Sequence, residues 1–262
     1  MKYIIVALIL ILGTSIVWAE ESARETYSIN PTFQPWEMRD YKVEAAVKGK
    51  ILMPDSTALT DVDIAVSYKI RHKYTRREGD GLLPLEISLV EGQITTGGQK
   101  LAITPMLYPK LTVLLDKQWH ISDIFGPSDS QLAQSLPGIN YNNLIMLFYV
   151  PDIEKPHAIG DKWESTVKLP SYGETYGFVN TLKSIDTIDG IKAATIHQEL
   201  TRLPKPDEKE TSTMKAVVDS SFALDSGKLL KSHIESKIKF AGKNKDEADP
   251  YTNSTIDISL AK

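Results

Sequence analysis

Hydrophobic and polar residues alternate without interruption between Val62 and Tyr74. A period of two predicts a β-strand with one packed face and one hydrated face. At roughly 3.3 Å per residue, this strand would span about 40 Å, which is long for a compact sandwich and typical of a strongly curved sheet or half-barrel. The expected packed face carries Val62, Ile64, Val66, Tyr68, Ile70, His72 and Tyr74, and the hydrated face carries Asp63, Ala65, Ser67, Lys69, Arg71 and Lys73.

The C-terminal half repeats this alternation over several segments. Asp189-Gly190 and Gly227 predict tight hairpin turns, because glycine adopts the positive φ that such turns need. A last strand is expected near Thr252 to Leu260, after a return strand over Ile191 to Arg202. The other expected faces carry Tyr176, Phe178, Asn180, Leu182 and Ser184; Met214, Ala216, Val218, Ser220, Phe222 and Leu224; and Leu230, Ser232, Ile234, Ser236, Ile238 and Phe240.

The middle of the chain lacks this alternation. Ser128 can cap a short helix that Pro137-Gly138 ends, and residues 142–149 favour a second helix over a buried strand. The pattern therefore predicts a mainly β fold: a curved antiparallel sheet or half-barrel of about ten strands, with short helices near 128–149. Two half-sheets joined near residues 126–160 fit this order of elements.

The first 19 residues have the layout of a secretory signal peptide. Lys2 provides a positive charge, Tyr3 to Leu12 is apolar, and Val17-Trp18-Ala19 precedes two acidic residues. An uncleaved anchor is less favoured, because a spanning helix needs roughly 18–20 apolar residues. We expect cleavage after Ala19 and export to the periplasm or the exterior. Residues 20–35 would then be a loose leader, and residues 36–262 a single β-rich domain.

Composition narrows the function further. The 262 residues carry a formal net charge of −4 and include no cysteine. Mild acidity argues against a nucleic-acid partner, and the lack of cysteine excludes disulfides, thiolate metal sites, a cysteine nucleophile and a lipoprotein anchor. Phosphate-binding, dinucleotide-binding and hydrolase motifs are missing, and the five histidines lie far apart. We therefore expect no enzyme activity, no cofactor and no metal site.

The remaining candidates are surfaces of the predicted sheet. The expected function is non-catalytic binding, in the cell envelope, of a lipid, an amphipathic ligand or a protein partner on a concave apolar face. The main alternative is a secreted structural or interaction protein with a packed core; an envelope hydrolase and a transmembrane barrel are less favoured. The candidate apolar ligand face comprises Val66, Tyr68, Ile70, Phe178, Leu182, Val218 and Phe222, and the candidate contacts to head groups or a partner are Lys69, Arg71 and Lys73.

A succession of turn motifs also carries a family resemblance. Gly160-Asp161-Lys162-Trp163 opens the second half, Asp189-Gly190 follows in a hairpin, and Asp225-Ser226-Gly227-Lys228-Leu229 forms a late turn. This order resembles uncharacterised families of exported bacterial β-proteins, and it covers about residues 159–240. In outline it is similar to the periplasmic lipoprotein-carrier half-barrel, which encloses an apolar cavity. The resemblance implies a β half-barrel and assigns no functional residue.

Overall fold

The fold consists almost entirely of β-strands. The computed structural model describes residues 24–52, 58–76, 79, 81–104, 110–117, 119–126, 149–170, 173–203, 213–240 and 250–261. Within these ranges there are 14 strands, and 12 of them form one sheet. Every strand pair in it is antiparallel, so the predicted fold class is confirmed. The predicted signal peptide, residues 1–19, and nearly all of the predicted helical region, residues 127–148, lie outside the described residues.

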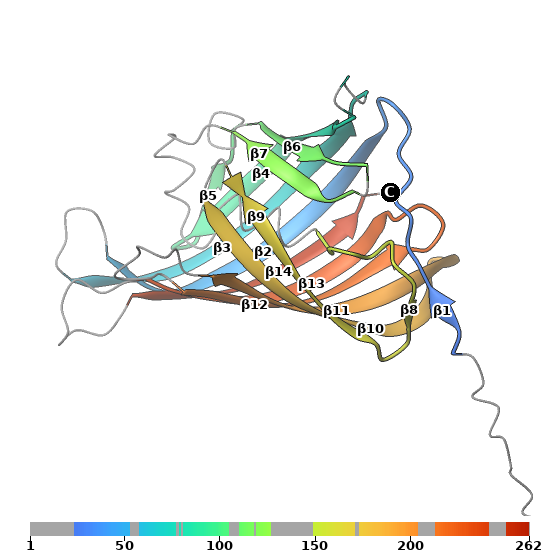
Figure 1. Ribbon diagram of the computed structural model, residues 1–262. Helices are drawn as coiled ribbons and strands as arrows, with labels where there is room; N and C mark the ends of the chain where they lie inside the picture. The colour runs from blue at the N-terminus through green and yellow to red at the C-terminus, as the bar shows by residue number, and fades with distance from the viewer. Residues whose placement is uncertain are drawn as a thin grey trace, which may run out of the picture.

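Two meanders make up the large sheet. The first contains β2 (Met38–Leu52), β3 (Leu59–Tyr74), β4 (Leu83–Thr96), β5 (Gln99–Ala102), β6 (Leu111–Leu115) and β7 (Ile121–Phe125). The second contains β9 (Lys162–Leu169), β10 (Glu174–Ile188), β11 (Ile191–Leu203), β12 (Thr213–Ala223), β13 (Leu229–Lys239) and β14 (Tyr251–Leu260). The last strand, β14, pairs with β2 and joins the two meanders into one sheet (Figure 1).

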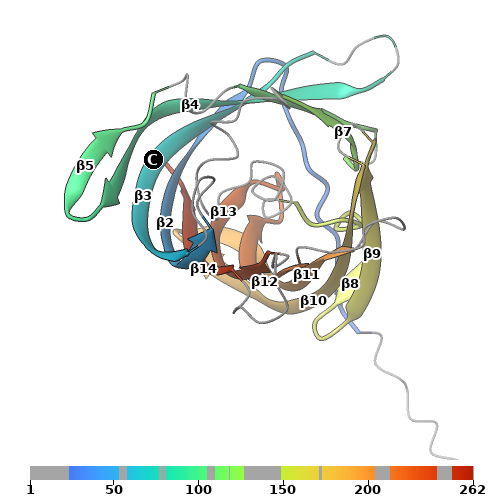
Figure 2. The same ribbon diagram turned by 90° about the vertical axis from the view of Figure 1, so that its left-hand side faces the viewer.

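The sheet curls until its two ends meet. β7 and β9 are the terminal strands of the sheet, and they contact each other, so the sheet is nearly closed (Figure 2). It is thus more closed than a half-barrel and has more strands than the expected ten. The additional strands include β5, β6 and β7, whose four or five residues carry too few alternations to stand out in the sequence.

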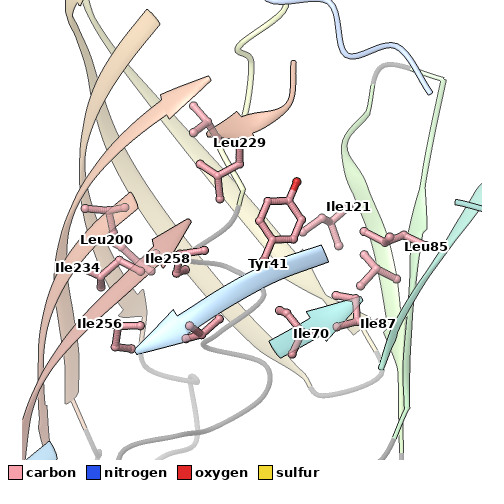
Figure 3. Packing of buried hydrophobic residues seen from close by; sticks show 14 of the residues in the cluster. Tyr41, Ile70, Leu85, Ile87, Ile121, Leu200, Leu229, Ile234, Ile256 and Ile258 are labelled. Carbon is pink, nitrogen blue, oxygen red and sulfur yellow. The ribbon is translucent and has the colours of Figure 1, made fainter. Parts of the chain in front are cut away.

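The interior of the curved sheet holds the main hydrophobic core. The alternation predicted for β3 is confirmed over its second half, where every second residue from Val66 to Tyr74 is buried. Tyr41 of β2 projects into the space between the wall that carries Leu200 and Ile234 and the wall that carries Leu85 (Figure 3). Both walls therefore contribute to one apolar interior, as expected for a sheet that wraps around its core.

Two β-bulges change which side chains face inward. One lies between Leu182 and Ser184, so Ser184 pairs with Thr195 and leaves the face on which alternation had placed it. The other lies where Ser221 pairs with Lys231 but Phe222 pairs with Leu229. Leu229 consequently faces the core, and Leu230 packs in a separate small cluster with Ala193 and Ala223. The predicted inward positions of Ser184 and Leu230 were wrong for this reason.

Both predicted hairpin turns have the expected glycine conformation. Asp189 and Gly190 have φ of 50° and 81°, the two positive values of a type I′ turn between β10 and β11. Gly227 has φ of 62° in the turn between β12 and β13. There the Gly227 amide donates to the Ala223 carbonyl at 2.9 Å. The register of the second meander is therefore set by residues that tolerate positive φ.

The N-terminal segment runs across one end of the curved sheet. β1 (Thr26–Tyr27) pairs with β8 (His157–Ala158) in a separate two-stranded sheet. The Ile29 amide then donates to the Ile153 carbonyl at 3.1 Å, and the Thr32 amide to the Ser226 carbonyl at 3.2 Å. No helix in the described part of the chain has the length and apolar character needed to cross a membrane.

Candidate functional site

A cavity of about 120 Å³ lies under this N-terminal segment. Its walls come from both meanders, from the segment around Ile29 and Phe33, and from the loop around Tyr149 and Glu154. Most of its lining is hydrophobic, as in typical small-molecule sites. The hydrophobic lining includes Tyr41, Tyr74, Leu85, Val113, Trp119 and Phe222.

Aromatic rings and one guanidinium group form part of the cavity wall. Phe33 stacks on Tyr74 with ring centroids 3.9 Å apart, and it meets Trp119 edge-on at 4.5 Å. Arg39 Cζ lies 4.4 Å from the Phe33 centroid and 5.0 Å from the Tyr74 centroid. These contacts tie the N-terminal segment to β2 and β3 through dispersion and cation–π attraction.

The buried charge of Arg39 is already compensated. Its side chain is 3% exposed, and its Nε donates to Glu37 Oε1 at 2.8 Å while a second nitrogen donates to the Thr32 carbonyl at 3.0 Å. Partial burial opposes ionisation of Glu37, but hydrogen bonds from Arg39 and the Gln34 amide outweigh it and lower the pKa of Glu37. An anionic ligand group is therefore not needed to neutralise this end of the cavity.

Burial keeps the rings of His72, Tyr41 and Tyr74 uncharged near neutral pH. Burial, reinforced by the charge of Arg39, lowers the pKa of His72 to about 3. Burial also raises the pKa of Tyr41 to about 12 and raises that of Tyr74 further. Around these rings the cavity presents neutral aromatic and aliphatic surface beside the Arg39–Glu37 ion pair, and this part of the cavity suits an apolar group better than a charged one.

One wall of the cavity carries a histidine among carboxylates. His120 follows the turn between β6 and β7, and its backbone amide donates to Asp116 Oδ1 at 2.9 Å. His120 Nδ1 lies 3.3 Å from Asp116 Oδ2, while Nε2 lies 3.8 Å from Asp152 Oδ1 and 3.5 Å from Glu154 Oε1. The ligand atoms of His120, Asp152 and Glu154 all lie within 4.8 Å of one another.

The seven residues predicted as the apolar ligand face come together in the core. All of them are buried in the same hydrophobic cluster, but only Phe222 also lines the cavity described above. Their role in ligand binding therefore stays a prediction. The seven are Val66, Tyr68, Ile70, Phe178, Leu182, Val218 and Phe222.

The predicted basic stripe lies on the outer face of β3, where it is paired with acidic residues. Arg71 donates two hydrogen bonds to the Asp40 carboxylate at 2.7 and 2.9 Å, and Lys69 Nζ lies 3.0 Å from Asp40 Oδ2. Lys73 Nζ lies 3.5 Å from Glu86 Oε2. Contact with head groups or a partner would have to compete with these ion pairs, and it too stays a prediction.

Neither Arg39 nor the group of carboxylates around His120 was predicted from the sequence. Arg39 had a detectable signal, because it is a charged residue in the buried phase of β2, two positions before Tyr41 and four before Val43. A charge in that phase must be paired, so it marks a polar site within the core. The grouping of His120 with Asp152 and Glu154 had no local signal, since it depends on closure of the sheet.

Comparisons with known proteins give no family. No protein-family model matches the sequence, and no curated protein matches it. Among solved structures, one described as lipid–protein interactions in lipovitellin aligns over 88% of this chain with a TM-score of 0.45 and 11% sequence identity. This chain spans 26% of that chain. So distant a likeness carries no argument about function, and the resemblance to exported β-proteins and lipoprotein carriers stays a prediction.

Proposed function

We propose that this protein is an exported, non-catalytic binding protein whose cavity accepts the apolar end of an amphipathic ligand. The observation that carries the proposal is the hydrophobic cavity of about 120 Å³ at the end of the curved sheet. Exposed hydrophobic groups gain roughly 25 cal/mol for each Å² removed from water, so an apolar group gains free energy by entering it.

The size of the cavity limits what it accepts. An engineered apolar cavity of roughly 150 Å³ holds one benzene ring, whereas pockets that enclose a drug-sized molecule measure roughly 300–1,000 Å³. A cavity of about 120 Å³ therefore suits a ring or a short acyl segment rather than a whole long-chain lipid. The head group of the ligand would lie outside, near the polar rim that includes His120 and Glu154.

Export and the lack of catalysis are parts of the same proposal. The layout of residues 1–19 supports cleavage after Ala19 and a periplasmic or extracellular location. The pairing of Arg39 with Glu37, and the neutral rings of His72 and Tyr74, support binding rather than acid–base chemistry at the apolar part of the cavity.

Binding of a homologous series of carboxylic acids tests the proposal. Titration calorimetry with butanoic, hexanoic, octanoic and dodecanoic acid should give affinities that rise about fourfold per methylene at first, since each buried methylene is worth roughly 0.8 kcal/mol. The affinity should then level off once the cavity is filled. Val113→Phe fills the cavity from β6 and should abolish binding, whereas Val167→Phe, on β9 and not among the cavity residues, should preserve it.

A structural or interaction protein with a packed core is the alternative. It predicts no saturable binding of any acid in the series and no difference between Val113→Phe and Val167→Phe. An affinity that keeps rising with chain length through dodecanoic acid would also count against this cavity, because it would require a larger apolar site.

A further inference from the structure

The imidazole of His120 faces carboxylates from two directions. Asp116 lies beside Nδ1, at 3.3 Å, and Asp152 and Glu154 lie beside Nε2. Neither contact of Nε2 is a hydrogen bond, and this buried atom has no hydrogen-bond partner within the described ranges of the chain. A neutral imidazole has one N–H and one lone pair, while an ionised carboxylate only accepts hydrogen bonds. Either neutral tautomer therefore directs a lone pair at a negatively charged oxygen.

Two arrangements remove this repulsion. Either the ring is a doubly protonated imidazolium, or a cation lies between Nε2 and the two carboxylates. The second arrangement follows a common pattern, in which a metal-bound histidine donates its other N–H to a carboxylate that fixes the tautomer. Here Asp116 has that position. It is itself held in place, because its Oδ1 accepts the His120 amide hydrogen at 2.9 Å.

The geometry points to a divalent transition-metal site formed by His120 Nε2 and the carboxylates of Asp152 and Glu154. Zinc binds imidazole nitrogen and carboxylate oxygen at about 2.0–2.2 Å, so tetrahedral ligand atoms lie roughly 3.3–3.6 Å apart. The observed separations from Nε2 are 3.5 Å and 3.8 Å, close to this range, and all three ligand atoms lie within 4.8 Å of one another. An imidazole ligand favours zinc and similar metals over calcium, which prefers oxygen ligands alone.

Lys155 is the competitor for this site. Its Nζ donates to Asp152 Oδ1 at 2.5 Å, the same oxygen that faces His120. The Lys155 side chain is 61% exposed, so it can leave Asp152 without exposing the core. Ser165 Oγ donates to the other oxygen of Asp152 and would hold the carboxylate in orientation when Lys155 departs. Replacing Lys155 by an uncharged residue should therefore strengthen metal binding.

The site is independent of the proposed ligand. The three metal ligands come from the turn between β6 and β7 and from the loop before β8. They were not expected from the sequence, because positions 120, 152 and 154 form no local motif. His120 and Glu154 also line the cavity, so a bound metal would lie at its wall. Metal binding can nevertheless be measured without any carboxylic acid, and its failure would leave the cavity proposal unaffected.

Titration of the full-length protein with Zn²⁺, in competition with a chromophoric chelator, tests the inference. One equivalent should bind, and His120→Gln should weaken binding by at least tenfold. Asp116→Asn should weaken it by about 10–100-fold, the usual effect of losing a carboxylate behind a metal-bound histidine. Lys155→Met should tighten it about tenfold. His233→Gln is the matched control, because His233 is an exposed histidine paired with Asp257 on β14.

Three results would contradict the proposed metal site. No saturable binding at one equivalent would show that these three residues do not form a metal site. Equal weakening by His120→Gln and His233→Gln would show adventitious binding to surface histidines. Because Lys155 is exposed, Lys155→Met keeps the test valid even if the His120 variant fails to fold, and unchanged Zn²⁺ affinity in Lys155→Met would exclude Asp152 as a ligand.

Discussion

The turn at Gly227 offers a quantitative test of how the N-terminal segment is held. Gly227 has φ of +62°, and a Cβ built on it would lie 2.7 Å from the Cα of Pro31. Gly190 has φ of +81° in the other hairpin, but a Cβ there would meet nothing within 4 Å. The two glycines therefore share the conformational requirement and differ in the contact with Pro31.

Alanine at each position separates these two effects. An L-residue in the left-handed conformation costs about 1–2 kcal/mol, so Gly190→Ala should lose about that much unfolding free energy. Gly227→Ala carries the same cost and must also displace the segment around Pro31, which overpacking data put at about 1–3 kcal/mol. The expected total for Gly227→Ala is roughly 2–5 kcal/mol, at least about 1 kcal/mol more than for Gly190→Ala.

Urea unfolding followed by circular dichroism measures the difference. For a protein of this size, each kcal/mol also lowers the melting temperature by about 2–4 °C, which provides a second readout. Because Gly227 and Pro31 both line the cavity, Gly227→Ala should weaken hexanoic acid binding while Gly190→Ala leaves it unchanged. If Gly227→Ala is no more destabilising than Gly190→Ala, the N-terminal segment does not pack on this turn as described.

The remaining predictions concern charge and core packing. The pKa of His72 falls from about 6.5 in the unfolded chain to about 3 in the folded protein. The stability that neutral His72 contributes is therefore fully present above pH 6.5 and is lost as the pH falls toward 3, by up to about 1.4 kcal/mol per pH unit. In urea unfolding at a series of pH values, His72→Gln should flatten this slope. A hydrogen bond with Asp257 raises the pKa of His233, so the stability contributed by this pair is present below pH 6.5 and is lost as the pH rises through the pKa of His233 in the folded protein. His233→Gln should therefore reduce the melting temperature at pH 5.5 and leave it unchanged at pH 8.5. Hydrogen bonds from Arg71 and Lys69 outweigh the opposing effect of burial and lower the pKa of Asp40 from 3.8 to about 2. Asp40→Asn should therefore reduce the unfolding free energy by about 1 kcal/mol at pH 7, and this difference should disappear below pH 2. Val66 is 3% exposed in the core, so Val66→Trp should destabilise by roughly 1–3 kcal/mol or more in thermal unfolding, and an unchanged melting temperature would indicate open space beside β3.

Alternation in the sequence predicted the faces of the long strands well and failed where the strand register shifts. A bulge adds one residue to one strand, which leaves the local pattern of side chains intact but turns the following residues to the opposite face. Ser184 follows one bulge, and Leu230 lies within the other. No residue near them signals a bulge. By contrast, the glycine turns were predictable, because a tight turn needs a positive φ and glycine adopts it without steric cost, as Gly190 and Gly227 do.

The first meander was only partly predicted for a different reason. Leu83, Leu85, Ile87 and Leu89 alternate with less buried residues in β4, so this strand had a usable signal. The contact between β7 and β9 had none, since it joins the two ends of the sheet across many intervening residues. The cavity and the cluster around His120 both depend on this closure, and so the site could not be located from the sequence.

Fluorescence of Trp119 most directly tests the claim that the cavity binds an apolar group. With Trp18, Trp36 and Trp163 replaced by phenylalanine, Trp119 is the only tryptophan and lines the cavity. Titration with 6-bromohexanoic acid, whose bromine quenches a nearby indole, should give saturable quenching at the concentrations that titration calorimetry finds for hexanoic acid. A matched protein that retains only Trp36, which is 59% exposed, should show no saturable quenching. If the Trp119 protein shows only the linear collisional quenching of the Trp36 protein, the ligand does not occupy this cavity.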